Sequence, residues 1–596
     1  MKARAGSGKQ HATPPRGSHR AEGVAFSANP LLTVRLPAWR SKLLLFVLFC
    51  SFLSLIGRAV YLQGGVNTEF LQRQGEARYA RTLDVPATRG RMTDRNGVVL
   101  ASSVPAKAIW AIPEDVEITP EQTRDLARLL DLPVGELKRR LTAEDKSFVY
   151  LRRQVDADVA ERIAAMKLAG IHDTREFKRH YPDGPASAHI VGFTNVEDRG
   201  QEGMELAQER QLAGRPGSRR VIKDRLGRIV EDAWLREPLD GRDLSLSLDS
   251  RIQYLAHAAL KAAVEKNNAK AGAVVVADTR TGEILALANW PTYDPNVRGR
   301  FSPELTRNRV LTDTFEPGST LKAFSIAAAL EVGKVRPDTK IQTAPGRLTI
   351  GDRSIGDAHP HGILSVEEVL AKSSNVGTAK IALELPAQTL WDTYTRVGFG
   401  QAPQIGFPGA VAGRMRPART WRPIEQATIS YGHGISVSLI QLARAYTVFA
   451  RDGDVIPLTL MKTDVPATGT QVFKPETARA MRKMLEMATA PGGTARQAQI
   501  SGYRVAGKTG TALKVKQGRY VKDYVASYVG FAPASDPRIV VAVMIDEPKG
   551  GSIYGGVVAG PIFAQVTSGA LRTLQIDPDG PLRDSNGQLL AMEVQR

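Results

Sequence analysis

A run of twenty predominantly apolar residues, Leu43 to Leu62, constrains the fold of this chain more than any other feature. Its one charge is Arg58, near its far end. A helix of about 20 predominantly apolar residues crosses a bilayer, so we expect a single transmembrane helix over residues 43–62. We expect no second span later in the chain. The sequence therefore predicts one span that anchors a large domain outside the membrane.

The segment before this span is a basic arm. Residues 1–42 hold eight Lys and Arg side chains against one acid, Glu22. Positive residues beside a span favour the cytoplasmic side, so we expect the arm in the cytoplasm and the rest of the chain outside. A cleaved signal peptide is the alternative, but the arm is long for one and no small-x-small cleavage site follows cleanly.

Composition narrows the partners and the chemistry. The net charge of +19 suggests an anionic neighbour: nucleic acid, a membrane surface or another polyanion such as a bacterial cell wall. A nucleic-acid-binding tail would have a similar composition to the basic arm. This arm, however, leads directly into the predicted span, which favours a membrane surface as its neighbour. The one cysteine, Cys50, excludes an intramolecular disulfide and a Cys-x-x-Cys zinc site, and it lies in the apolar run as a small hydrophobe.

At 596 residues the chain exceeds what one hydrophobic core supports. After the span, the pattern of apolar and polar residues changes near residue 236, where strand-like and helical patterns become longer and more apolar. We therefore expect a basic arm over 1–42, a transmembrane helix over 43–62, a non-catalytic pedestal domain over 63–235, a second domain over 236–575 and a polar tail over 576–596.

The pedestal domain carries structural patterns and no evident chemistry. Thr119 and Pro120 are typical of a helix start, and a second helix is expected near Asp156. Two Gly-rich stretches, residues 89–103 and 188–210, lack a nucleophile paired with a base. We interpret both as structural or interaction elements, the first with a hairpin turn at Asn96-Gly97.

The second domain alternates strands and helices. A helix is expected over residues 250–266, followed by two strands around Arg280-Thr281-Gly282. Two more strands are expected near the C-terminus, over residues 524–532 and 538–545. This order predicts an α/β (α+β) fold in which helices cover an antiparallel sheet.

The strongest local signal for catalysis is FEPGSTLKAFSIAAALEVGK. Ser319 is predicted to open a helix that runs to about Val332 and ends at Gly333. Lys322 lies one turn further on the same face, where its amine can reach the serine oxygen. A desolvated lysine can have its pKa lowered enough to activate a serine. Alone, the pattern also fits an N-cap serine beside a lysine that extends to solvent.

Two further motifs strengthen this interpretation. Ser373-Ser374-Asn375 lies between two helical stretches, where Ser373 and Asn375 can both point into a cleft. Lys508-Thr509-Gly510-Thr511 precedes the C-terminal strands and can supply a positive charge, hydroxyls for a carboxylate and a glycine that admits a substrate backbone.

Two competing patterns are rejected. Gly502 to Thr509 matches the P-loop spacing, but a P-loop needs a hydrophobic strand before it and a sustained helix after it, and the flanking sequences favour neither. His359 and His361 are two residues apart without further metal ligands, so we interpret them as loop residues.

Ser-x-x-Lys, Ser-x-Asn and Lys-Thr-Gly in this order are the motif set of penicillin-binding proteins and serine β-lactamases. From the anchor to about residue 570, the chain resembles a class B penicillin-binding protein of the division-specific type. The likeness rests on RGRMTDRNG, HIVGFTNVEDRGQEGMELAQE, FEPGSTLK, KSSNVGTAKIAL, YGHGISVSLIQLARAY and VAGKTGTALK. The absence of a preceding glycosyltransferase segment leads us to expect a transpeptidase and not a bifunctional synthase.

The resemblance implies a D,D-transpeptidase of the bacterial inner membrane that cross-links septal peptidoglycan without metal or cofactor. Ser319 would attack the bond between two terminal D-alanines, with Lys322 as base and Ser373 as proton relay. Asn375 would hold the donor amide, and Lys508 would order the serine and lysine. Thr509 and Thr511 would bind the terminal carboxylate, with Gly510 between them.

The resemblance also implies partners and leaves alternatives. The partners would be donor and acceptor stem peptides, β-lactams, a membrane-embedded glycan polymerase and other division proteins, and not nucleic acid. The resemblance allows D-Ala-D-Ala carboxypeptidase activity as a side reaction. The alternatives are an elongation-type transpeptidase, a non-enzymatic penicillin sensor or scaffold, and a β-lactamase.

Overall fold

The computed structural model describes residues 37–63, 80–143, 146–223, 229–297, 299 and 301–581. Most of the predicted basic arm and of the predicted polar tail lies outside the described residues. The described residues form two compact units. One contains residues 37–63, 80–83, 220–223 and 229–233, and the other contains the remainder.

The first helix, α1 (Ala38–Gln63), contains the predicted span. Residues 38–61 have a mean hydropathy of 2.3, and the helix is long and apolar enough to cross a membrane. The helix begins five residues before the predicted start, directly after Pro37, where a proline is well tolerated. A three-stranded sheet in the order β1-β6-β7 comprises β1 (Ala80–Val85), β6 (Gly217–Lys223) and β7 (Ile229–Arg236).

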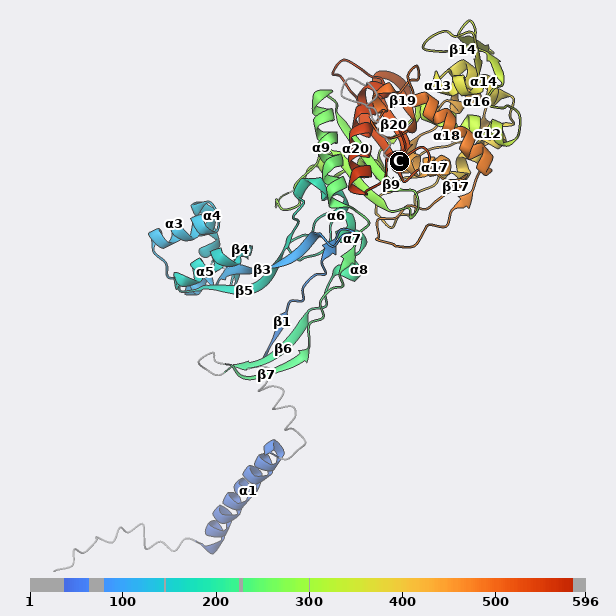
Figure 1. Cartoon of the computed structure of the whole chain (residues 1–596). Coiled ribbons are helices and arrows are strands. Elements are labelled where there is room, and N and C mark those ends of the chain that lie inside the picture. Colours follow the sequence, from blue (N-terminus) through green and yellow to red (C-terminus); the bar gives the residue numbers. More distant parts are fainter. Residues whose placement is uncertain are drawn as a thin grey trace, which may run out of the picture. The chain divides into compact units, whose positions relative to one another are not determined.

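One part of the pedestal domain is a small α/β body with its own core. Helix α3 starts as predicted, because Thr119 and Gln122 form a reciprocal capping box. The long strand β3 pairs with both β4 and β5, and α3, α4 and α5 lie beside these strands (Figure 1). The elements are β3 (Val99–Ala111), α3 (Pro120–Leu129), α4 (Val134–Leu141), β4 (Val149–Asp156), α5 (Ala157–Ala165) and β5 (Ile171–His180).

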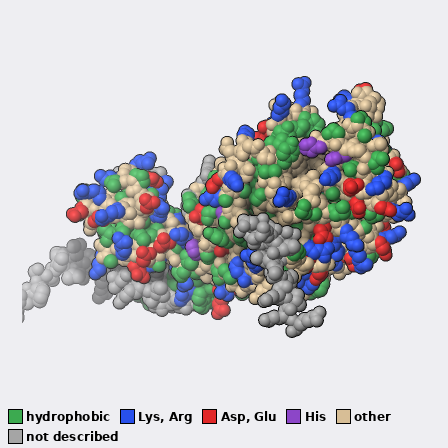
Figure 2. Space-filling model, turned by 45° about the horizontal axis from the view of Figure 1, so that its top comes forward, with side chains coloured by type: hydrophobic (Ala, Val, Ile, Leu, Met, Phe, Trp, Pro, Cys, Tyr) green, Lys and Arg blue, Asp and Glu red, His purple; other side chains and the backbone are tan. Residues whose placement is uncertain are grey.

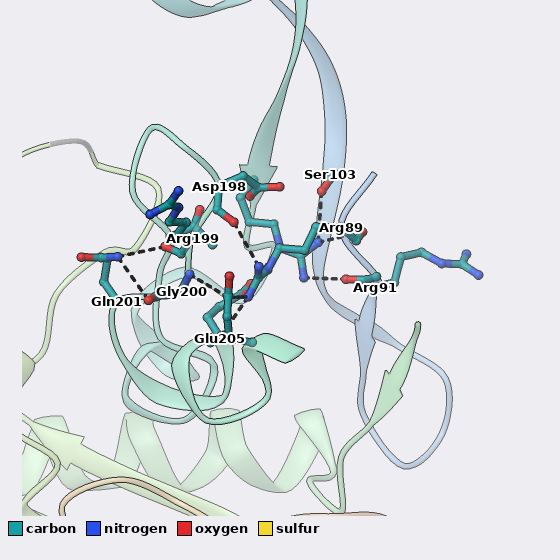
Figure 3. A network of polar contacts seen from close by, with 12 residues as sticks. Arg89, Arg91, Ser103, Asp198, Arg199, Gly200, Gln201 and Glu205 are labelled. Atoms are coloured by element: carbon teal, nitrogen blue, oxygen red, sulfur yellow. Dashed lines mark hydrogen bonds and ion pairs between the residues drawn. The ribbon is translucent and has the colours of Figure 1, made fainter. Parts of the chain in front are cut away.

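A buried ion network joins the two Gly-rich stretches of the pedestal domain (Figure 3). Glu205 is fully buried and binds two arginines through its two oxygens. Arg89 Nε lies 2.5 Å from Glu205 Oε2, and Arg179 Nε lies 2.7 Å from Oε1. Arg89 also pairs with Glu209 at 2.6 Å. Both stretches are therefore structural, and short helices complete this region: α6 (Ala188–Val191), α7 (Gly203–Ala207) and α8 (Glu209–Leu212).

The first Gly-rich stretch also packs on the C-terminal part of the chain. Strand β2 (Met92–Thr93) pairs in parallel with β8 (Leu244–Ser245), and a turn with Gly97 at φ +87° links β2 to β3. Arg95 lies 3.0 Å from the buried Glu283 of the next domain. One continuous apolar core therefore extends from Met92 and Leu100 into the C-terminal part of the chain.

The C-terminal sheet has five antiparallel strands in the order β10-β9-β21-β20-β19. Strand β9 is buried on both faces because its side chains alternate between two cores. Val274 and Val276 lie in the core that includes α9 (Ser250–Lys266) and α20 (Gly560–Thr573), whereas Val275 and Ala277 lie in the core that includes α17 (Leu439–Ala450) (Figure 1). The strands are β9 (Ala271–Asp278), β10 (Ile284–Trp290), β19 (Ala506–Lys516), β20 (Arg519–Ala532) and β21 (Ile539–Asp546).

Helices cover both faces of this sheet, which confirms the predicted fold class. The predicted helix over 250–266 is α9 (Ser250–Lys266), and Asp249 caps its first turn. The others are α10 (Pro303–Thr306), α11 (Arg309–Thr312), α12 (Lys322–Glu331), α13 (Val366–Ala371), α14 (Asn375–Leu383), α15 (Ala387–Arg396), α16 (Pro423–Ser430), α17 (Leu439–Ala450), α18 (Pro475–Thr489), α19 (Gly555–Val558) and α20 (Gly560–Thr573).

Short strand pairs connect the helices: β11 (Thr314–Phe315) with β16 (Val437–Ser438), β12 (Lys340–Gln342) with β15 (Ile363–Ser365), β13 (Arg347–Ile350) with β14 (Arg353–Gly356), and β17 (Asp454–Val455) with β18 (Thr470–Gln471). On the face that Figure 2 shows, basic and acidic side chains are interspersed, without the continuous basic stripe that is typical of a nucleic-acid-binding surface.

Candidate active site

Ser319 lies on a tight turn at the start of a buried helix. The turn is a 3-10 helix over Gly318–Leu321, and α12 follows it directly. The sequence had predicted an α-helical first turn at Ser319, but this turn is a 3-10 helix. The predicted end of the helix is confirmed by Gly333 at φ +71°. The Ser319 side chain is half-buried.

Glycines bring three distant segments together beside this serine. Gly318 has φ of +55°, and its amide donates to the carbonyl of Gly432 at 3.2 Å. A Cβ atom on Gly432 would lie 2.1 Å from the Gly318 oxygen, and one on Gly318 would lie 3.3 Å from the Thr511 oxygen. Only glycine fits at position 432, because any side chain there would collide with Gly318. The turn over Gly318–Leu321, called the nucleophile turn after the predicted role of Ser319, therefore meets the YGHG segment and β19 here.

Lys322 is fully buried, and its amine faces Ser373. Its Nζ lies 2.5 Å from the Ser373 carbonyl oxygen and 3.1 Å from Ser373 Oγ. Burial, together with the nearby charge of Lys508, holds the pKa of Lys322 well below its usual range, and Asp357 opposes this shift. The described residues contain no hydrogen bond between Lys322 Nζ and Ser319 Oγ, so the predicted direct contact is replaced by the one to Ser373.

The Ser373–Asn375 segment forms the sharp corner between α13 and α14. Ser373 has φ of +61°, a conformation that non-glycine residues rarely adopt. Ser374 caps α14 by accepting the Gly377 amide at 2.9 Å and donates to Asp357 at 2.7 Å. These bonds hold the corner that turns Ser373 towards Lys322.

Asn375 is the first residue of α14 and has a different partner. Its Nδ2 donates to the carbonyl oxygen of Gly356 at 2.9 Å. In this structure, the side-chain amide therefore joins the corner to β14.

Lys508 completes the polar group from the sheet. It is fully buried on β19, the edge strand, and its Nζ lies 3.0 Å from Ser373 Oγ. Burial lowers the pKa of Lys508 to about 7. The Ser373 hydroxyl thus lies between two lysine amines that come from a helix and from a strand.

The rest of the Lys-Thr-Gly motif follows along β19. A Cβ atom on Gly510 would lie 2.7 Å from the Pro317 oxygen, so this glycine lets the nucleophile turn approach the strand. Thr511 Oγ1 accepts the Gly555 amide at 3.0 Å, and Thr509 Oγ1 lies 3.4 Å from Thr494 Oγ1. The structure places all the predicted site residues on the nucleophile turn with α12, on the α13–α14 corner and on β19.

Sequence reasoning missed a second polar group next to the nucleophile. Glu316 Oε1 accepts the Gly434 amide at 2.8 Å and the Tyr520 hydroxyl at 3.0 Å, and Glu316 Oε2 lies 3.4 Å from His433 Nδ1. Burial raises the pKa of Glu316 and, with the Lys322 charge, lowers that of His433 to about 4. The Tyr431 ring centre lies 6.0 Å from Lys322 Nζ.

A signal for part of this group was available. Glu316, Tyr431 and His433 lie in the quoted segments FEPGSTLK and YGHG, although nothing in these letters shows that the segments meet. Asp357, which supports the Ser373 corner, has no sequence signal, because it follows an unremarkable hairpin.

The rejected patterns have ordinary structures. Lys508 and Thr509 continue as strand β19 and open no helix, so the P-loop geometry does not occur at this motif. His359 and His361 lie in the loop between β14 and β15. Among the described residues, no cluster of three His, Cys, Asp or Glu side chains could hold a metal ion.

Two protein-family models match this chain. Residues 272–568 match the penicillin binding protein transpeptidase domain, and residues 84–246 match the penicillin-binding protein dimerisation domain. The chain is 46% identical over 549 residues to the probable peptidoglycan D,D-transpeptidase PenA of Neisseria gonorrhoeae, covering 91% of this chain and 94% of the relative. It is 42% identical over 549 residues to the peptidoglycan D,D-transpeptidase FtsI of Escherichia coli K12, covering 91% and 93%.

Solved structures show the same fold. The transpeptidase domain of penicillin-binding protein 3 from Burkholderia pseudomallei is 50% identical, with a TM-score of 0.53, and the match covers 56% of this chain and 98% of that domain. With relatives of this identity over most of its length, the chain belongs to the family of penicillin-binding D,D-transpeptidases.

Proposed function

We propose that the chain cross-links septal peptidoglycan through an acyl-enzyme on Ser319. The observation that carries this proposal is the convergence of two buried lysine amines on the hydroxyl of Ser373, next to the nucleophile turn. Burial lowers the pKa of Lys322, which favours the uncharged amine that can accept a proton.

In the first half-reaction, Ser319 Oγ attacks the carbonyl carbon between the two terminal D-alanines of a donor peptide. Lys322 Nζ takes the hydroxyl proton, and the C–O bond forms. The backbone amides of Ser319 and Thr511 stabilise the oxyanion. Each donor of this kind typically stabilises the transition state by about 3–4 kcal/mol. The close approach of Gly318 to the Thr511 backbone supports this pairing.

The C–N bond then breaks. Ser373 Oγ gives its proton to the leaving amine and receives one from Lys322 Nζ, 3.1 Å away. Free D-alanine leaves, and Ser319 holds the rest of the donor as an ester. Lys508 at 3.0 Å holds the Ser373 hydroxyl in place during this transfer.

In the second half-reaction, an amine of another stem peptide attacks the ester. The proton path runs in reverse, so Ser319 regains its proton and a new peptide bond forms. Thr509 and Thr511 bind the donor carboxylate before the first step, and Asn375 binds the donor amide. For Asn375 this requires exchange of its present bond to Gly356.

The septal role within this proposal rests on the name of one relative and on one motif residue. The Escherichia coli relative carries the name FtsI, and the triplet here ends in Asn375, which resembles the division type. The basic arm before α1 favours a cytoplasmic N-terminus and an exterior catalytic domain. In a division role, the partners of the chain would be a membrane-embedded glycan polymerase and other division proteins. The alternative is a role in elongation.

Mass spectrometry of the intact chain after exposure to benzylpenicillin tests the reaction. We expect one covalent adduct on Ser319, because the strained amide mimics the terminal D-alanine bond. Lys322→Ala should slow its formation by about 10²- to 10⁴-fold, as expected for a lost general base. The adduct should persist for many minutes, since no second base is assigned to hydrolyse it.

Two variants make this result decisive. Ser319→Ala should show no adduct, whereas Ser325→Ala, one turn further along α12 and bonded to Tyr394, should retain it. An adduct on another residue of a folded chain would contradict the mechanism, and rapid loss of the adduct would indicate a β-lactamase.

A further inference from the structure

A polar cavity of about 630 Å³ adjoins the nucleophile turn on the side away from Lys508. Its volume is in the range of ordinary ligand pockets. Glu316 and Gly434, both next to segments that meet at Ser319, form one part of its wall. The residues Leu513, Lys514 and Val515 of β19 form another. The remaining wall comes from α10, α11, β11, the segments around Arg414 and Ser436, strands β20 and β21, and Lys270.

Most charges in this wall neutralise each other. Asp546 lies 2.6 Å from Lys514, and Asp313 lies 3.1 Å from Arg309. Arg309 also pairs with Glu304 at 3.0 Å. The acids of the wall are therefore occupied, apart from Glu316, which accepts bonds from Gly434 and Tyr520 at the edge nearest Ser319.

Two basic side chains of the wall remain without an ion pair among the described residues: Arg414 and Lys270. Both are exposed to solvent. The charge of Lys270 also reaches Glu304, whose pKa is lowered first by the hydrogen bond from Arg309 and to a smaller extent by Lys270. Six basic and four acidic side chains line the cavity, so its wall has an excess of positive charge.

The direction of the donor peptide links this cavity to the reaction, and this step rests on the proposed function. If Thr509 and Thr511 hold the carboxylate of the terminal D-alanine, the peptide on the acyl side of the scissile bond continues towards Leu513 and Val515. Strand β19 is the edge of its sheet, so an extended peptide can lie along it. That path leads into the cavity.

We infer that this cavity binds a carboxylate carried by the donor stem peptide upstream of its terminal D-alanine pair, with Arg414 and Lys270 as the cationic partners. Arginine suits this task because its guanidinium can bind both carboxylate oxygens. Glu316, an acid near Ser319, keeps the carboxylate away from the reacting atoms and directs it further in. The site therefore selects for acidic stem peptides.

The test compares matched peptide thioesters that acylate the full chain in detergent. Each probe ends in D-alanyl-D-thiolactate, and the first or the second residue before this pair is either glutamate or its amide isostere glutamine. The wild-type chain should be acylated at least about fivefold faster by a glutamate probe than by its glutamine partner, as a partly solvated charge-assisted bond would give.

In Arg414→Ala with Lys270→Ala, this preference should disappear, and in Arg414→Glu it should reverse. Arg419→Ala, an exposed arginine in the same loop that does not line the cavity, should keep the preference. The rate with benzylpenicillin should be unchanged in every variant, which also shows that each is folded.

A wild-type chain without the preference, or cavity variants that retain it, would overturn the inference while penicillin acylation persists. Failure of benzylpenicillin to acylate Ser319 at all would instead overturn the proposed function.

Discussion

Two lysines are buried around one serine hydroxyl, and this arrangement opposes folding. Neither Lys322 nor Lys508 has a carboxylate within ion-pair distance among the described residues, and both amines contact Ser373. Burial removes the hydration of both amines and lowers the pKa of each, and the charge of Lys508 lowers the pKa of Lys322 further. The site is therefore arranged for proton transfer and not for stability.

Lys508→Met should make the protein more stable while it removes most of the acylation. The pKa of Lys508 is about 7 in the folded chain, below its value of about 10.4 in an unfolded one. The free-energy cost of burying the charged Lys508 amine is complete below pH 7. This cost shrinks as pH rises towards 10, because the unfolded state binds more protons than the folded state in that window. We expect a gain of about 1–3 kcal/mol at pH 7, reduced by lost hydrogen bonds.

Urea unfolding at pH 7 and pH 9.5 measures this effect. The difference between wild type and Lys508→Met should be smaller at pH 9.5. Lys516→Met, on the exposed end of the same strand, serves as the control and should leave the free energy of unfolding nearly unchanged. An equal or lower stability of Lys508→Met at pH 7 would contradict the burial penalty.

At the scale of elements, patterns with a regular period were predictable. Helix α9 has the predicted bounds, and the hairpin at Gly282 forms between β9 and β10, because capping residues and alternating apolar residues act locally. The positive φ of Ser373 was not predictable, since it depends on Asp357 from another hairpin. The 3-10 turn at Ser319 likewise depends on contacts with Gly432 and β19.

The buried ion network of the pedestal domain is another long-range arrangement. Glu205→Gln should lower the free energy of unfolding by about 3–5 kcal/mol, because Arg89 and Arg179 would remain buried without their shared carboxylate. Chemical unfolding of the full chain measures this loss.

The exposed pair Arg91–Asp243 offers a matched control in the same domain, and Asp243→Asn should cost about 1 kcal/mol or less. The folded fraction of Glu205→Gln should react with penicillin at the wild-type rate, because the network holds no catalytic group. Equal losses in the two variants would show that Glu205 is not the centre of this domain's stability.

At the scale of the whole molecule, the catalytic site and the anchor belong to different compact units. All side chains described for residues 38–61 of α1 are exposed, as expected for a helix that faces lipid. The acylation chemistry therefore depends on residues of the second unit alone. We expect α1 to determine where in the cell that chemistry takes place.

We therefore predict that the full chain, depleted and replaced in its host cell, places fluorescent β-lactam labelling at midcell and supports division. A chain without residues 1–63 and exported by a cleavable signal should react with penicillin in solution at the wild-type rate, because no residue of the proposed site is removed. It should nevertheless fail to restore midcell labelling, and the cells should grow as filaments. Ser319→Ala in the full chain separates location from catalysis: it should reach midcell as a fluorescent fusion and still leave filaments. Labelling along the side wall, with rounded cells on depletion, would instead assign the chain to elongation.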